Sequence, residues 1–419
     1  MGNKDFIVMN QKIIKIVQSL GILDKISWPA QLEQEFFRKI NKSGNKPILK
    51  FHYQKYDLSG SKKELQRLKI NLSKENPLHI YTSLLIDSYC KSIDMIHAIG
   101  SQQFQEISIE EYGKPTHLLF QGKYSHLDTA KSFVKSFSDY EHPYMIEDGQ
   151  TYSALELKKY LVKESRKVFG KFSPKIILTH EITAKAAAGK SRVRLRENAL
   201  FSTYDFKQLL VHEIMTHSLT AINGSLQSQL PVLGLGSPRT TKTQEGLATF
   251  SEIITGSLDL TRLKRLSLRV VALDMALNGA DFYDLYFYFL SNGQDKKESY
   301  LSASRILRGG YPKGGIAFTK DGVYLEGLIR VHSFFRWAFK TKNLDLTHLL
   351  FCGRLDINDI FLFKSAYENG LIEPPKFLPT WYDRIDLLAG KMAFSLILND
   401  IDLDSVDNHY SNKINKVAA

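Results

Sequence analysis

The six residues HEIMTH, His212 to His217, impose the strongest constraint on what this chain can fold into, because they lie in a segment that the sequence delimits as one helix. Before the segment, Ser202 and Asp205 form an S-x-x-D capping pattern, and Asn223-Gly224 after it is typical of a helix C-terminus. The apolar residues between these signals recur at helical spacing. We therefore expect HEIMTH to lie on a mostly buried helix that ends at Asn223-Gly224.

The two histidines of this segment are five residues apart. A regular α-helix would point them about 140° away from each other, whereas residues four apart differ by only about 40°. One extra residue, accommodated as a π-bulge, would bring both rings onto one face. The sequence therefore predicts a widened turn between Glu213 and His217 and a metal site on it. The alternative is a pair of histidines that are buried in a helical core and satisfied by hydrogen bonds.

A catalytic zinc site needs a third protein ligand and an open fourth position. A T-x-x-Q pattern at Thr241–Gln244 predicts that a new helix begins there, with Glu245 in its first turn. Glu245 is the candidate third ligand, and Glu252, seven residues later on nearly the same face, is the substitute. Gly246 would let the two helices approach closely. The alternative for Glu245 is a carboxylate that only stabilises the N-terminus of its helix.

Four segments together resemble one known family: RVRLREN, VHEIMTHSLTAINGSLQ, GLGSPRTTKTQEGLATFSE and RGGY…FTKDGVYLEGL. They are similar to the QEGLA-motif family, which groups bacterial proteins with microtubule-associated tyrosine carboxypeptidases. The resemblance covers Thr151 to Trp337 and extends more weakly upstream. It implies zinc-dependent removal of a C-terminal Tyr or Phe from a polypeptide, and the substrate of the eukaryotic members is α-tubulin.

By motif position, the resemblance implies that His212, His217 and Glu245 bind Zn²⁺ and that Glu213 is the catalytic glutamate. The chemistry is consistent with this assignment, since Zn²⁺ lowers the pKa of a bound water to about 7 and polarises a carbonyl group. A glutamate beside a ligand, facing the open position, can accept the proton of the water and pass it to the leaving amine.

An exopeptidase also needs a cation for the terminal carboxylate of its substrate and donors for the oxyanion. Arg192, Arg194 and Arg196 alternate along one predicted strand and therefore share a face, which could line the cleft. The alternative is that this face is a solvated strand edge.

A second group of candidates lies further along the chain. Arg308 begins the glycine-rich turn RGGYPKGG, and Thr319 is the predicted N-cap of a helix that carries Lys320 and Tyr324. Lys320 could meet the terminal carboxylate, and Tyr324 could donate to the oxyanion; both also match motif positions of the family. Simple capping and packing is the alternative. The candidate substrate-binding residues are Arg194, Arg196, Arg308 and Lys320, and Tyr324 joins Glu213 as a candidate catalytic residue.

The whole pattern predicts an α+β protein: a helix-rich zinc-metallopeptidase catalytic domain with a small sheet, preceded by a smaller α+β N-terminal region. The predicted strands are KPILKFHY, KIILTHEITA and KSRVRLREN, the last two joined by a small-residue turn at Ala186 to Gly189. We expect amphipathic helices over 1–40, an N-terminal α+β module over 41–150, the catalytic domain over 151–400 and a C-terminal tail over 401–419.

Charge and cysteine content limit the partners and the compartment. The 419 residues carry 56 Lys+Arg against 44 Asp+Glu, a net charge of +12. This excess favours an acidic partner, such as an acidic protein, although a solvated basic surface is the alternative. The usual nucleic-acid-binding signatures are missing, so no nucleic-acid partner is expected.

Two cysteines without a CxxC pair suit a reducing compartment, and the N-terminus lacks a long uncharged apolar run. We therefore expect a cytoplasmic protein with no membrane span.

These features favour a zinc metallocarboxypeptidase that releases Tyr or Phe from a polypeptide C-terminus. One alternative is a non-catalytic regulatory or binding protein that retains the metallopeptidase fold, and another is a basic scaffold without chemistry. The presence of Glu213 favours the enzyme, because a purely structural zinc site needs no glutamate at that position and has its fourth position filled.

Overall fold

The computed structural model describes residues 2–43, 46–138, 150–180, 182, 184–399, 402 and 405–406. The chain is 66% helical and contains a small mixed sheet of three strands. The predicted helix-rich α+β class is therefore confirmed. The predicted C-terminal tail over 401–419 lies almost entirely outside the described residues.

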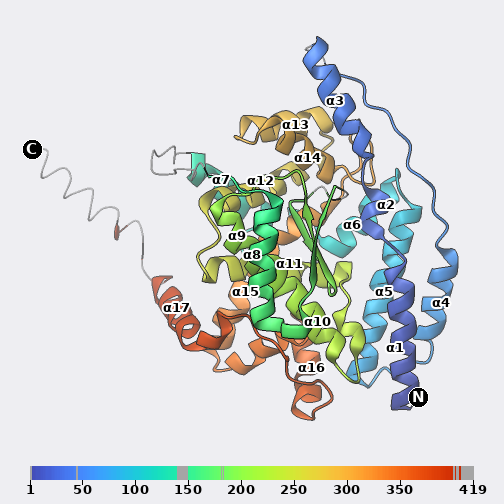
Figure 1. Cartoon of the computed structure of the whole chain (residues 1–419), viewed down its shortest axis with the longest axis vertical. Coiled ribbons are helices and arrows are strands. Elements are labelled where there is room, and N and C mark those ends of the chain that lie inside the picture. The colour runs from blue at the N-terminus through green and yellow to red at the C-terminus, as the bar shows by residue number, and fades with distance from the viewer. Residues whose placement is uncertain are drawn as a thin grey trace, which may run out of the picture.

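Seven α-helices lie in the described residues up to Ser138. They are α1 (Asn3–Gln18), α2 (Ile22–Ile26), α3 (Ala30–Ser43), α4 (Ser59–Lys69), α5 (Pro77–His97), α6 (Gln102–Tyr112) and α7 (His126–Ser138). Helices α1, α4 and α5 run side by side along one edge of the molecule (Figure 1).

The prediction that KPILKFHY forms a strand is wrong. In the described part of 41–150 the chain forms no strand beyond an isolated bridge between Leu118 and Ser125, so the expected α+β module is helical. The apolar side chains that alternate along KPILKFHY pack on aromatic rings instead: Phe51 packs on Trp28, and Tyr53 packs on Tyr311. Phe51 and Tyr53 are thus half-buried against other aromatic rings, and the described residues offer them no partner strand.

One segment, Lys4–Ile40, is long and apolar enough to pass for a membrane span by length and composition alone. The structure divides it among α1, α2 and α3. The longest of these, α1, has 16 residues, whereas a spanning helix needs about 20. Phe6, Met9 and Ile13 of α1 are buried in the main apolar core. The segment is therefore weak evidence for a membrane span.

The sheet contains β1 (Lys175–Thr179), β2 (Ala186–Ala188) and β3 (Arg192–Arg196) in the order β1-β3-β2. Strand β1 is parallel to β3, and β2 is antiparallel to it. The predicted turn at Ala186 to Gly189 is thus mostly a strand, because β3 offers a second edge and three alanines fit beside it. Helix α8 (Ala154–Phe169) packs on the sheet and ends at Gly170 as predicted (Figure 1).

The remaining chain is built from helices around the sheet and the core. Three of them are continuous: α9 (Thr203–Leu209), the π-helix η3 (Leu210–Ser218) and α10 (Leu219–Leu226). The further α-helices are α11 (Pro238–Ile254), α12 (Leu260–Leu277), α13 (Phe282–Ser291), α14 (Lys296–Ile306), α15 (Val323–Lys340), α16 (Asp359–Glu368) and α17 (Ile385–Leu398). Short 3₁₀ segments include η4 (Pro231–Gly234), η5 (Thr319–Gly322) and η6 (Leu344–Phe351).

The predicted end of the histidine-bearing helix at Asn223-Gly224 is wrong by two residues. Gly224 is needed for close packing, since a Cβ there would lie 2.3 Å from the backbone of Leu233. The amide of Asn223 donates to the carbonyl oxygens of Phe351 and Phe377 at 2.8 Å each. The two residues therefore anchor the helix to its neighbours before it ends at Leu226.

Helix α11 begins four residues earlier than predicted. The backbone N–H of Ser237 donates to Oγ1 of Thr240 at 3.1 Å, and Pro238 occupies the first helical position. Glu245 therefore lies in the second turn and not in the first. Gly246 does allow a close helix contact, but the contacting helix is α15, where a Cβ on Gly246 would lie 2.3 Å from the backbone of Gly327.

One apolar core runs through both parts of the chain. Phe6 of α1 and Ile93 of α5 belong to the same buried cluster as Leu161 of α8, Leu195 of β3 and Leu247 of α11. The N-terminal helices therefore pack directly on the elements that carry the histidines. The domain boundaries at residues 40, 150 and 400 stay predictions.

A buried histidine lies where α7 meets α12. His126 is 2% exposed, and its Nε2 has no hydrogen-bond partner among the described residues. Burial lowers the pKa of His126 to about 4, although Glu326 opposes the shift. The unfolded chain, in which a histidine has a pKa of about 6.5, therefore binds more protons between pH 4 and 6.5 than the folded protein does.

We expect this histidine to make the protein less stable in acid. The contribution of neutral His126 to the free energy of unfolding is fully present above pH 6.5 and decreases as the pH drops toward 4. Between pH 7 and 5 the free energy of unfolding should decrease by about 2 kcal/mol for this reason. Urea denaturation of wild type and His126→Gln at both pH values measures this difference. The variant should lose less stability on acidification, and equal losses in the two proteins would contradict the prediction.

Candidate metal centre and active site

The widened turn predicted in the histidine segment is confirmed. Helix α9 begins with the predicted Ser202–Asp205 capping box and continues into the π-helix η3, which covers Leu210–Ser218. The hydroxyl of Thr216 donates to the carbonyl oxygen of Val211, five residues earlier, at 3.0 Å. Because π-helical hydrogen bonds join residues five apart, positions 212 and 217 share one face. Their imidazole centroids lie 4.8 Å apart, and the ring planes are nearly perpendicular.

The end of the π-helix is held by an arginine from a distant loop. Arg354 donates to the carbonyl oxygen of His217 at 3.0 Å. Widened helical turns leave backbone carbonyls that need partners from outside the helix. Arg354 therefore contributes to fixing the backbone that positions His217.

Glu245 of α11 faces both imidazoles. Its Oε2 atom lies 3.4 Å from Nε2 of His212 and 3.3 Å from Nε2 of His217. The three candidate ligand atoms lie within 4.8 Å of one another, and Oε2 is buried without a hydrogen-bond partner in the described part of the chain. Two imidazole nitrogens and a carboxylate oxygen are a usual ligand set for catalytic zinc, so the residues present fit that ion.

Glu252 lies on the other side of the His212 ring. Its Oε1 is 2.6 Å from Nδ1 of His212, and it also accepts hydrogen bonds from Arg262 at 3.0 Å and Gln208 at 2.9 Å. Burial opposes ionisation, but Arg262 and His212 hold the pKa of Glu252 at about 2. Glu252, the substitute ligand candidate, is therefore an orienting carboxylate, because it leaves Nε2 of His212 directed at Glu245.

The electrostatics of this cluster favour a positive charge. Although burial lowers it, Glu245 and Glu252 together raise the pKa of His212 to about 10. A buried imidazole between two carboxylates therefore attracts either a proton or a metal cation, and cation binding would release the proton.

Lys320 of η5 contacts the other oxygen of the ligand carboxylate. Its Nζ lies 3.3 Å from Oε1 of Glu245. Burial opposes it, but Lys320 and the two histidines hold the pKa of Glu245 well below its usual range. The predicted contact of Lys320 with a substrate carboxylate stays a prediction. One oxygen of Glu245 is engaged by Lys320, and the other faces the imidazoles.

We expect Glu252→Gln to weaken zinc binding by roughly 10- to 100-fold, because a carboxylate that fixes a ligand histidine has effects of this size. Competition with a chromogenic chelator measures the affinity. Glu298→Gln, which removes a carboxylate outside the ligand cluster, is the control and should bind zinc as wild type does. Equal affinities of Glu252→Gln and wild type would contradict an orienting role for Glu252.

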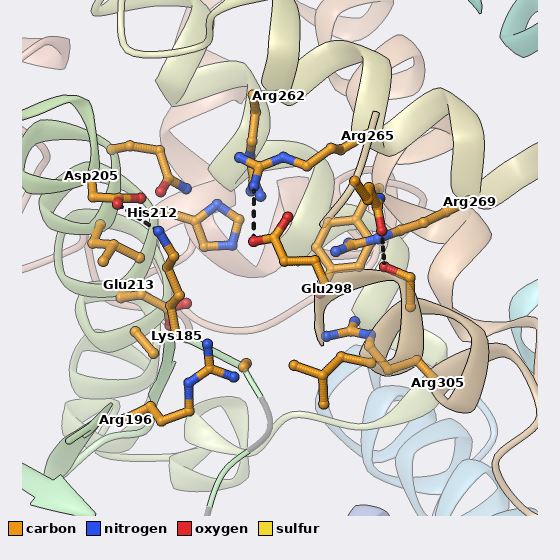
Figure 2. Close-up of a pocket in the computed structure, with 18 residues that line it drawn as sticks. Lys185, Arg196, Asp205, His212, Glu213, Arg262, Arg265, Arg269, Glu298 and Arg305 are labelled. Atoms are coloured by element: carbon orange, nitrogen blue, oxygen red, sulfur yellow. Dashed lines mark hydrogen bonds and ion pairs between the residues drawn. The ribbon is translucent and has the colours of Figure 1, made fainter. Parts of the chain in front are cut away.

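A cavity of about 170 Å³ lies beside the candidate ligand His212 (Figure 2). His212, Glu213 and Tyr324 line it, and Glu213 is 9% exposed. The other charged lining residues are the basic Lys185, Arg196, Arg262, Arg265, Arg269 and Arg305 and the acidic Asp205 and Glu298. Six basic side chains against three carboxylates make the cavity attractive to an anionic ligand.

The predicted substrate-binding residues are distributed unevenly around this cavity. Arg196 lines it, whereas Arg194 and Arg308 are absent from its lining. The arginines of β3 do share a face, with Val193 and Leu195 buried on the opposite side. Their positions along the strand decide which of them reaches the cavity.

The predicted helix start at Thr319 needs correction. Thr319 opens the 3₁₀ segment η5, and its hydroxyl donates to the carbonyl oxygen of Ser108 on α6 at 2.9 Å. Tyr324 is the second residue of α15, which confirms its predicted place just inside a helix, and it lines the cavity. Its assigned role remains a prediction.

Sequence reasoning missed the basic face of α12. Arg262, Arg265 and Arg269 all line the cavity, and Arg305 of α14 joins them. The spacing of the first three, at i, i+3 and i+7 in TRLKRLSLR, places them on one face of a helix and is the signal that could have revealed them.

Together, the fold and the site define a helix-rich α+β protein in which a π-helix and a crossing helix bring two histidines and a glutamate together beside a basic cavity. A family model described as microtubule-associated tyrosine carboxypeptidase matches residues 34–400. The chain belongs to this family, which confirms the resemblance found in its motifs. A search of curated proteins returned no match. Family membership implies tyrosine carboxypeptidase activity and a polypeptide partner.

Proposed function

We propose that this protein is a cytoplasmic zinc carboxypeptidase that releases a C-terminal Tyr or Phe from a polypeptide. His212, His217 and Glu245 would hold the zinc, and Glu213 would act as the general base. The observation that carries the proposal is the convergence of the three ligand atoms within 4.8 Å, beside a cavity that Glu213 also lines. The family match supports the carboxypeptidase part of the proposal.

When bound, zinc would activate a water molecule and polarise the scissile carbonyl group. Glu213 follows His212 directly in the chain and lines the cavity. In the described structure it forms no ion pair, whereas Glu245 and Glu252 each do. Its carboxylate can therefore accept a proton from the attacking water and deliver it to the nitrogen of the leaving amino acid.

Tyr324 is the candidate donor to the oxyanion. Its ring lies 5.4 Å from the ammonium of Lys320 and 5.7 Å from the guanidinium of Arg269. Two cations at this distance favour negative charge near the tyrosine, which is where an oxyanion would need stabilisation. The basic lining of the cavity also suits an acidic polypeptide as the substrate.

Metal analysis combined with a peptide assay tests this proposal. Purified protein should contain bound zinc and should release Tyr or Phe from peptides with a free C-terminus, but not from the same peptides with Ala at the end. Removal of zinc by a chelator should stop the release. Zinc without cleavage of any peptide in a C-terminal library would favour a non-catalytic binding protein, and the absence of zinc would contradict the proposal.

A further inference from the structure

The cations around the cavity differ in whether a carboxylate already neutralises them. On α12, Arg262 is held by Glu252, and Arg265 lies 3.9 Å from Glu298. On α14, Arg305 donates to both oxygens of Asp321 at 2.8 and 2.7 Å. Each of these arginines has a protein counter-ion.

Arg269 lacks such a counter-ion. Among the described residues it forms no ion pair, and its Nε atom is buried without a hydrogen-bond partner. Burial and the neighbouring Arg305 lower the pKa of Arg269 to about 10, although Asp321 opposes part of the shift. A buried cation beside a second cation is costly unless an anion accompanies it. The surroundings of Arg269 therefore point to a ligand that brings a negative charge.

Arg269 lines the same cavity as His212 and Glu213. It lies seven residues after Arg262 on the same face of α12, about 10 Å along the helix axis. Arg262 contacts Glu252, which in turn contacts the candidate ligand His212. Figure 2 shows Arg269 on the opposite side of the cavity from Lys185 and Arg196. An anion bound at Arg269 would therefore lie in the cavity that His212 and Glu213 line, further along α12 than Arg262.

We propose that Arg269 binds the terminal carboxylate of the substrate, and this inference rests on the proposed carboxypeptidase function. A guanidinium group can donate two parallel hydrogen bonds to a carboxylate. The ring of Tyr324, 5.7 Å away, lies against the same guanidinium and limits its movement. Arg269 is thus a specificity-determining residue, because it requires a free carboxylate at the end of the peptide.

The other buried cations near the candidate ligands are less suited to this task. Lys320 contacts Glu245, and Arg354 donates to the backbone of His217 and is absent from the cavity lining. The N–H donors of Lys320 and Arg354 therefore already contact Glu245 and His217, two of the three candidate ligands. Arg269 lines the cavity and forms no ion pair with any described residue, and Asp321, which engages Arg305, offsets its charge only in part.

The test measures peptide binding separately from cleavage. A fluorescent peptide that ends in Tyr is offered to zinc-loaded Glu213→Gln protein, once with a free carboxylate and once as the amide. We expect the acid to bind at least tenfold more tightly than the amide. Adding Arg269→Gln should make the two affinities equal. A preference that survives this substitution, or no preference in the Glu213→Gln protein itself, would overturn the proposal.

Two further variants test whether the loss of a positive charge alone explains the result. Lys264→Gln removes a positive charge from the same helix outside the cavity lining and should keep the preference for the acid. Arg269→Lys keeps the charge but cannot form the two-pronged contact, so it should lower the preference several-fold. If Arg269→Gln fails to fold, the lysine variant decides, and an unchanged preference in it would overturn the proposal.

The two proposals can fail independently. If wild type cleaves no peptide but the acid preference depends on Arg269, the hydrolytic function is wrong and the carboxylate site stands. If wild type releases Tyr while the preference persists without Arg269, the enzyme stands and the anchor is another residue.

Discussion

Replacing Glu213 by glutamine should reduce the release of C-terminal Tyr by about 10²- to 10⁴-fold and leave the zinc content unchanged. Glutamine has the same shape as glutamate but cannot accept the proton of the attacking water. Glu213 lines the cavity and is not one of the three residues whose ligand atoms converge. The substitution therefore separates proton transfer from metal binding. Steady-state cleavage assays and metal analysis of the same preparations provide both measurements.

A shorter carboxylate is the matched control for this experiment. Glu213→Asp keeps a proton acceptor but moves it away from the reacting atoms, so its activity should lie between those of wild type and Glu213→Gln. Loss of zinc from the glutamine variant would show that Glu213 supports the metal site. Full activity in that variant would show that another group accepts the proton.

Replacing Gly327 by alanine should destabilise the fold by about 3 kcal/mol or more, because the added Cβ has no space. It would lie 2.2 Å from the carbonyl oxygen of Lys242 and 2.9 Å from backbone atoms of Gly246. Backbone atoms cannot move aside as a flexible side chain does, so α11 and α15 would have to separate. Urea denaturation measures the loss in the free energy of unfolding.

The same substitution should also weaken zinc binding, because α11 carries Glu245 and η5, just before α15, carries Lys320. Gly390→Ala in α17 is the control, since nothing lies within 4 Å of the added Cβ. This control should be unchanged or up to about 1 kcal/mol more stable, as expected for glycine to alanine inside a helix. A Gly327→Ala protein as stable as wild type would contradict the close contact between α11 and α15.

Local signals in the sequence were sufficient to predict those features that depend on a single helix. The spacing of His212 and His217, with a capping box before it, predicted the π-helical turn from geometry alone. Glu245 was found as the third converging residue even though the predicted start of its helix was wrong. The error arose because two capping patterns, at Ser237 and at Thr241, compete in adjacent turns, and only the first is used.

The remaining features depend on contacts between segments far apart in the chain. The alternation in KPILKFHY predicts a strand, but pairing needs a partner edge, and here aromatic packing takes its place. Three alanines suggest a turn until β3 is known to have a second edge. The helical spacing of Arg262, Arg265 and Arg269 is visible in the sequence, yet it fits a solvated face equally well. Only the packing of α12 against the cavity distinguishes the two.

The π-helical segment also affects how such a motif is recognised in sequences. The wide turn absorbs one residue more than an α-helical turn holds, so His212 and His217 occupy one face although they are five residues apart. The same absorption keeps the helix beyond it in register with the interior, where Leu219 and Ile222 are 0% and 3% exposed. A search pattern restricted to the H-E-x-x-H spacing would pass over sequences of this kind.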